Sequence, residues 1–102
     1  KIMLVATGEM GRTPKINAKG GRDHWGGITP LLLSGGGINT GQVIGQSTKD
    51  GGRPASSPFG NSHLIATILH TLLDVGELRT VTGLPSDVSQ ILSRYQPING
   101  LH

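Results

Sequence analysis

The chain has 102 residues, a length that corresponds to one domain at most. Hydrophobic residues make up 34% and aromatic residues 3%, and 17 residues are glycine, so we expect a piece of a larger domain without a sufficient core of its own. The net charge of +3 suits an anionic ligand without requiring one, and the lack of cysteine excludes disulfides and thiolate metal sites.

Two apolar segments early in the chain predict buried strands. Residues 2–7 are nearly all apolar and do not alternate strictly with polar residues, which is typical of a parallel sheet covered on both faces. Residues 29–34 repeat this character, and Pro30 should lie at the start of the strand or on a free edge. A third short strand is expected over residues 42–46. None of these runs reaches the length of a membrane-spanning helix.

Apolar spacing predicts two helices, near residues 62–75 and 86–95. The first helix has one apolar stripe, formed by Leu64, Ile65, Ile68, Leu69, Leu72 and Leu73. His63 and His70 lie off this stripe and are expected at the surface or at the rim of the core. The predicted fold class is therefore α/β, with a partial, largely parallel sheet flanked by helices.

The loop between the first two strands carries the candidate site. Glu9 falls just after the first strand, and Asp23 lies beside His24. Carboxylates and imidazoles bind divalent cations, whereas the guanidinium groups of Arg12 and Arg22 suit an oxyanion. In the alternative interpretation, the Asp23 side chain only closes a turn and Trp25 fills the edge of a core.

Several motifs of this chain resemble the C-terminal part of the DUF1501 family. They are GEMGRTP at residues 8–14, GRDHW at 21–25, LSGGGI at 33–38 and GQVIG at 41–45. The helical segment 64–73 and the closing residues 97–101 are also similar to that family, so the resemblance covers nearly the whole chain. DUF1501 proteins are bacterial, abundant in planctomycetes, and assigned to the alkaline phosphatase–sulfatase superfamily.

The resemblance implies that residues 1–102 form a single C-terminal fragment of an alkaline phosphatase-like domain. Glu9, Asp23 and His24 would then hold a divalent metal, zinc or calcium, at the carboxyl ends of the strands. Arg12 and Arg22 would bind a sulfated or phosphorylated substrate. The superfamily's nucleophile belongs to its N-terminal part, so no catalytic residue is assigned here and the chain is expected to be inactive alone.

Two functions stay open at this stage. The first is a fragment of a metal-dependent hydrolase that acts on sulfate or phosphate esters. The second is a non-catalytic binding or assembly component of an envelope or larger complex, which Met10 favours because it occupies a ligand histidine's position in the superfamily. The expected partners are the remainder of its own larger domain or partner subunits. Nucleic acid is not expected, because Trp25 is the loop's only aromatic residue. The resemblance favours a periplasmic or extracellular location.

Overall fold

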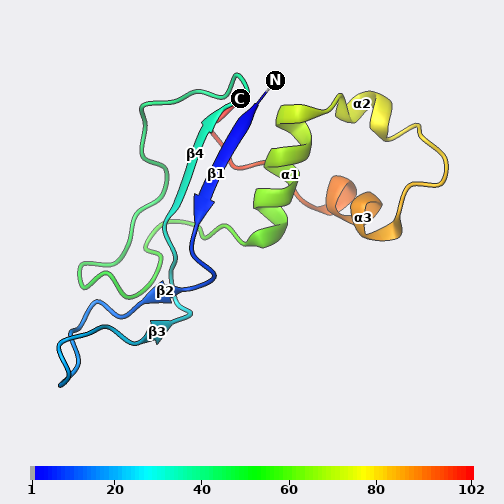
Figure 1. Cartoon of the computed structure of the whole chain (residues 1–102). Coiled ribbons are helices and arrows are strands. Elements are labelled where there is room, and N and C mark those ends of the chain that lie inside the picture. The colour runs from blue at the N-terminus through cyan, green and yellow to red at the C-terminus, as the bar shows by residue number, and fades with distance from the viewer. Residues whose placement is uncertain (1) are drawn as a thin grey trace. The chain divides into compact units, whose positions relative to one another are not determined.

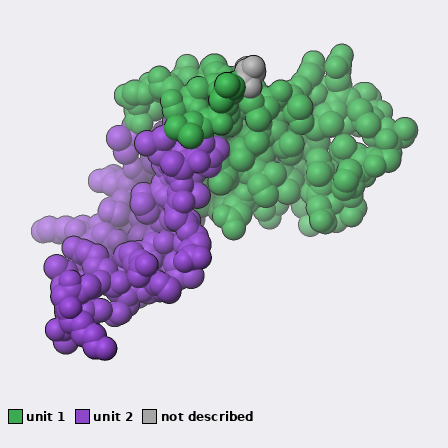
Figure 2. Space-filling model, viewed as in Figure 1, with its two compact units in different colours: residues 1–4, 34–42, 59–102 green, residues 5–33, 43–58 purple. Residues whose placement is uncertain are grey.

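A computed structural model describes residues 2–102, which divide into two compact units (Figure 2). Unit 1 comprises residues 2–4, 34–42 and 59–102, and unit 2 comprises residues 5–33 and 43–58. The buried hydrophobic side chains among the described residues all belong to unit 1: Ile38, Ala66, Val75, Leu92, Ile98 and Leu101. Unit 1 therefore holds the hydrophobic core, whereas unit 2 depends mainly on hydrogen bonds.

Four strands form two separate two-stranded sheets (Figure 1). Strand β1 (Met3–Thr7) pairs with β4 (Leu31–Gly35), and the two arrows in Figure 1 point in opposite directions. Strand β2 (Gly11–Arg12) pairs antiparallel with β3 (His24–Trp25). The strands predicted over residues 2–7 and 29–34 are therefore present: the first begins one residue later, and the second begins two residues later and ends one residue later.

The predicted parallel sheet is wrong. Parallel neighbours need a crossover connection, which is usually a helix. Residues 8–30, which connect β1 to β4, contain only the short β2–β3 pair and no helix, so the chain turns back and pairs in the antiparallel sense. The apolar composition of β1 and β4 was typical of a sheet covered on both faces, but most of their side chains are exposed here.

The strand predicted over residues 42–46 is absent from the described chain. Gly41 and Gly45 at its two ends adopt positive φ angles of 74° and 86°, which extended strands do not contain. Val43 between them is 94% exposed, so no apolar contact holds this segment against a neighbouring strand. Only an isolated bridge between Ser47 and Pro54 follows.

The two predicted helices are present as α1 (Asn61–Leu72) and α3 (Ser86–Arg94), although α1 ends three residues before its predicted end at residue 75. A third, α2 (Val75–Leu78), is a single turn that the apolar pattern did not predict. The Asp74 carboxylate accepts a hydrogen bond from the Glu77 N–H at 3.2 Å and caps this turn. Among helices of the described chain, α1 and α3 are in direct contact.

Helix α1 buries three of its small residues, whereas its large apolar residues are half-buried or exposed. Ala66 and Thr67 are fully buried and Thr71 nearly so. Ile65 is 42% exposed and Leu72 is 40% exposed. The apolar stripe that predicted this helix therefore does not face the core of unit 1.

The buried face of α1 contacts a C-terminal segment, residues 98–102. The Ile98 N–H donates to Thr67 Oγ1 at 2.8 Å, and Thr71 Oγ1 lies 2.8 Å from His102 Nε2. The same segment is held from another side, since the Asn39 N–H donates to the Leu101 carbonyl at 2.8 Å. The two threonines are thus the points at which α1 binds this segment.

Candidate functional site

All five residues predicted as a site lie within unit 2, on and around the β2–β3 hairpin. Glu9 follows β1 in a bend, just before β2. The ladder pairs Arg12 with His24 and Gly11 with Trp25. A cation, and not the Glu9 carboxylate, is therefore the direct cross-strand neighbour of the imidazole.

Gly11 explains why β2 and β3 can lie so close together. A Cβ atom built on Gly11 would lie 1.9 Å from the Ile28 carbonyl oxygen and 3.0 Å from that of Trp25. Any side chain here would collide with backbone atoms, which cannot move aside as a flexible side chain can. The glycine after Met10 is thus required by the fold of the hairpin, whatever the hairpin binds.

Arg12 and Arg22 were predicted to bind an anion. In the structure, their guanidinium groups donate hydrogen bonds within the hairpin loop. Arg22 Nη1 donates to the Thr13 carbonyl at 2.9 Å and also to the Pro14 carbonyl. Arg12 Nη1 donates to the Arg22 carbonyl at 3.2 Å. A guanidinium carries five N–H donors, so each arginine retains donors beyond those that hold the loop.

The carboxylate of Asp23 also acts within the loop. Asp23 Oδ1 accepts from Asn17 Nδ2 at 3.0 Å, and Asn17 Oδ1 in turn accepts from the N–H groups of Lys19 and Gly21 at 3.0 Å. The Thr13 N–H donates to the Asp23 carbonyl at 2.9 Å. This arrangement resembles the turn-closing role that the sequence left open for Asp23.

Trp25 connects the hairpin to the second loop of unit 2. Its indole N–H donates to the Gly52 carbonyl at 2.7 Å. That loop is itself closed by Asp50, whose carboxylate accepts from the Thr48 hydroxyl at 2.7 Å and from the Gly52 N–H at 3.0 Å. These bonds lower the pKa of Asp50 because they stabilise its charged form, and the bond from the Thr48 hydroxyl has the largest effect.

Metal ligation by Glu9, Asp23 and His24 stays a prediction. Within residues 2–102, no group of three or more histidine, aspartate or glutamate side chains lies close enough together to hold a metal ion. Three protein ligands are usual for a catalytic zinc. A complete centre of that kind is therefore not formed by the described residues alone.

The histidines of unit 1 occupy defined positions that their sequence spacing did not indicate. His63 lies between the rings of Phe59 and Tyr95, with centroids 5.5 and 5.3 Å away, and its Nδ1 accepts the Gly60 N–H at 3.1 Å. His70 Nδ1 lies 2.8 Å from the Ala66 carbonyl, so that nitrogen carries the proton. Both are half-buried, which agrees with the surface or rim position that we expected.

Sequence reasoning also missed Thr67 and Thr71. Their signal was a pair of hydroxyls four residues apart on one side of an otherwise apolar helix. Thr71 Oγ1 donates to the Thr67 carbonyl at 2.7 Å, so its contact with His102 uses the histidine's Nε2–H as donor.

Comparison with known proteins gives one result. The family described as "Protein of unknown function (DUF1501)" matches residues 1–92. No curated protein and no solved structure matches the chain. No helix of the described residues is both long enough and apolar enough to cross a membrane.

Proposed function

The chain belongs to the DUF1501 family, and on this premise we propose that it serves as a non-catalytic binding and assembly component of a larger protein. The observation that supports this proposal is the outward-facing apolar surface of α1. Ile65 and Leu72 are each about two-fifths exposed, at 42% and 40%, while the buried side of the helix is made of alanine and threonine.

The composition of α1 favours burial on both sides. None of its residues from Asn61 to Leu72 is charged. A helix that is apolar or uncharged all round is normally enclosed by other parts of a protein, since water would otherwise contact its large side chains. Ile68 and Leu69 extend the same surface between Ile65 and Leu72 and are half-buried.

The occupant that we propose for this surface is further polypeptide of the same larger domain. A two-stranded sheet is marginally stable on its own, and helices of mixed α/β proteins bury their apolar stripe against a sheet. More strands supplied by the same domain would satisfy both needs. This role agrees with a chain whose hairpin arginines are used to hold the loop itself.

Thiol reactivity tests this proposal, because these 102 residues contain no cysteine and the unsubstituted protein measures the background from any thiol elsewhere. Ile65→Cys and Leu72→Cys would be made in the full natural protein, with Val43→Cys as the exposed reference. We expect the two helix thiols to react with a maleimide at least about tenfold more slowly in the native protein than in urea, since a covered thiol reacts only when the structure opens. Helix thiols that react as quickly as in urea would refute the assembly role.

A metal-dependent ester hydrolase is the second candidate. It is favoured by the hairpin, which brings the Arg12 backbone opposite His24 and keeps Asp23 next in the chain. In this reading the cation would polarise a sulfate or phosphate ester, and free donors of Arg12 and Arg22 would bind its oxygens. The ligand set would need at least one group beyond those that this chain assembles.

Metal analysis of the full natural protein separates the two candidates. A hydrolase should carry about one divalent ion per chain, and Glu9→Gln or His24→Ala should remove it. His70→Ala is the matched control, since His70 lies on α1 in unit 1. An ion content unchanged by the hairpin substitutions would leave the assembly role as the better account.

A further inference from the structure

Asn99 and Gly100 form a turn within the C-terminal segment of unit 1. They are the only asparagine–glycine pair in the 102 residues. Gly100 has a φ angle of 97°, a left-handed conformation that glycine adopts without strain. Both residues are exposed. The turn therefore presents an asparagine side chain to water, directly before a residue that has no side chain.

An asparagine in such a position can react with its own backbone. The backbone nitrogen of the following residue attacks Cγ of the asparagine, its proton leaves with the side-chain nitrogen as ammonia, and a five-membered succinimide ring forms. Water then opens the ring at either carbonyl group, which gives aspartate or isoaspartate. A following glycine favours the attack because it has no Cβ atom to obstruct the ring.

Neither reacting group of this pair is engaged elsewhere in the described part of the chain. The Asn99 carboxamide and the Gly100 N–H make no hydrogen bond there, and the Gly100 carbonyl alone is held, by Gln42 Nε2 at 2.8 Å. Asn17 provides the contrast. Its Oδ1 accepts two backbone N–H groups, its Nδ2 donates to a carboxylate, and Ala18 follows it in the chain. Asn99 is therefore free to react, whereas Asn17 is held.

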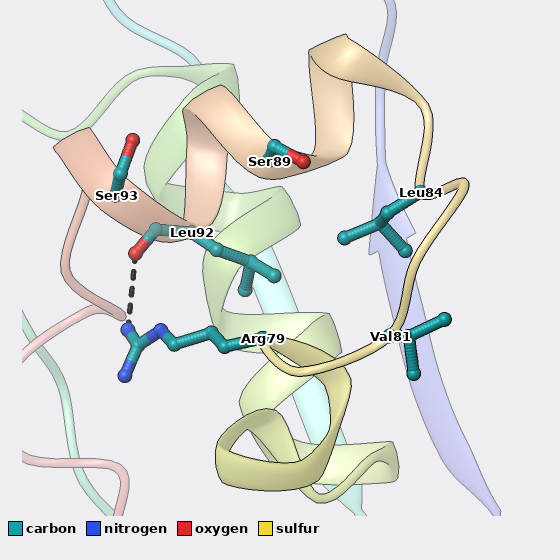
Figure 3. Close-up of a pocket in the computed structure, with 6 residues that line it drawn as sticks. All are labelled: Arg79, Val81, Leu84, Ser89, Leu92 and Ser93. Carbon is teal, nitrogen blue, oxygen red and sulfur yellow. Dashed lines mark hydrogen bonds between the residues drawn. The ribbon is translucent and has the colours of Figure 1, made fainter.

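The turn lies between fixed points. Before it, the Ile98 N–H donates to a buried hydroxyl of α1 at 2.8 Å, and after it the Leu101 carbonyl accepts from the Asn39 N–H at 2.8 Å. Helix α3, from which the chain enters this segment, is held near its end because Arg79 Nη2 donates to the Leu92 carbonyl at 3.0 Å (Figure 3). An isoaspartate carries the main chain through its Cβ atom and so lengthens the chain within the turn by one carbon atom. The longer turn no longer matches the distance between its two anchored ends.

We propose that Asn99 deamidates spontaneously to isoaspartate and that this change releases residues 98–102 from α1. The side chains of Ile98 and Leu101, which are 7% and 6% exposed, then become accessible to water more often. The turn acts as a modification site whose occupancy increases with the age of the protein. The proposal is independent of the assembly role, because it concerns the buried side of α1 and not its outward-facing surface.

Ageing of the full natural protein in mildly alkaline buffer tests the reaction. Peptide mapping by mass spectrometry should show Asn99 converting at least about tenfold faster than Asn17, whose amide must first break its hydrogen bonds. Electron-transfer fragmentation should identify isoaspartate in the product. Asn99→Gln should form no such product, because the longer side chain would have to close a six-membered ring. An Asn99 that stays an amide in the native protein but reacts in urea would overturn the proposal.

Amide exchange tests the release of the segment. In the isoaspartate form, exchange at the N–H groups of Ile98 and Asn39 should accelerate by roughly threefold to tenfold, the effect of losing one net hydrogen bond. Freshly prepared Asn99→Asp is the matched control, because it adds the same charge without lengthening the main chain, and its exchange should stay near that of the unchanged protein. Equal acceleration in Asn99→Asp would overturn the role of chain lengthening. Unchanged exchange in the isoaspartate form would refute the release.

Discussion

Thr67 and Ile98 lie 31 residues apart in the sequence and are joined by one buried hydrogen bond. The Ile98 N–H donates to Thr67 Oγ1 at 2.8 Å, and the same hydroxyl donates to the His63 carbonyl at 2.8 Å. Thr67 is completely buried, so neither partner can turn to water instead. The hydroxyl thus connects the interior of α1 to the C-terminal segment of unit 1.

The first prediction follows from that bond. Thr67→Val keeps the shape of the side chain but leaves the Ile98 N–H without its partner, so the free energy of unfolding should fall by about 1–3 kcal/mol. Urea unfolding of the full natural protein measures it. Thr67→Ser should restore most of the loss, and Thr80→Val, which removes an exposed hydroxyl bonded to Glu77, should change little. An unchanged free energy of unfolding in Thr67→Val would contradict the proposed role of the hydroxyl.

The second prediction concerns the closest backbone approach in the hairpin. Gly11→Ala would bring a methyl group to 1.9 Å from the Ile28 carbonyl oxygen, so β2 and β3 must separate. We expect a loss of roughly 1–3 kcal/mol in unfolding free energy, which is typical of overpacking. Gly26→Ala is the matched control in the same hairpin, because no atom lies within 4 Å of the added methyl. Equal melting temperatures of the two variants would rule out this steric account.

The third prediction concerns the arginine brace. Arg22→Gln removes the charged donor that reaches the Thr13 and Pro14 carbonyls, so the loop should open more often. Amide exchange at Thr13 and Gly21 should accelerate by roughly threefold to tenfold, the range expected when a single net hydrogen bond is lost. Lys19→Gln is the control, since Lys19 joins this network only through its backbone N–H. Unchanged exchange in Arg22→Gln would show that the guanidinium does not hold the loop, which would leave it available to an external ligand.

The sequence was sufficient for elements whose formation is local. Helices α1 and α3 were predicted from apolar spacing, and β1 and β4 from apolar composition. Strand direction was not predictable from composition, because Leu-rich and Val-rich segments suit parallel and antiparallel pairs alike. The missing observation was the lack of any helix between β1 and β4, which was already visible in the sequence and argues for a direct reversal.

The apolar stripe of α1 shows a second limit of pattern reading. Periodicity identifies which residues share a face of a helix. It does not say which face packs against the other residues of these 102. Here Thr67 and Thr71 bind the C-terminal segment, because a hydroxyl on a helix can satisfy a buried N–H. For the hairpin, the proximity of Arg12 and His24 depends on loop hydrogen bonds made by Asn17, which no motif indicated.

The last prediction concerns pH. Hydrogen bonds from Thr48 and Gly52 lower the pKa of Asp50, so the folded state binds the proton less readily than the unfolded chain does. Because the pKa of Asp50 is lower in the folded state, the ionised carboxylate stabilises the fold at pH values above the unfolded pKa of 3.8, and this stabilisation is lost as the pH falls through the folded pKa.

Carboxyl NMR titration of the full natural protein should give Asp50 a pKa below 3.8. Thr48→Val should raise it toward 3.8, because the side chain that makes the first of these bonds is removed. Ser47→Ala is the control, as the Ser47 hydroxyl donates to a carbonyl and not to the carboxylate. A Thr48→Val titration identical to that of the unchanged protein would show that this hydroxyl does not hold the Asp50 charge, and the Gly52 N–H would then be the remaining donor to the carboxylate in the loop that Trp25 contacts.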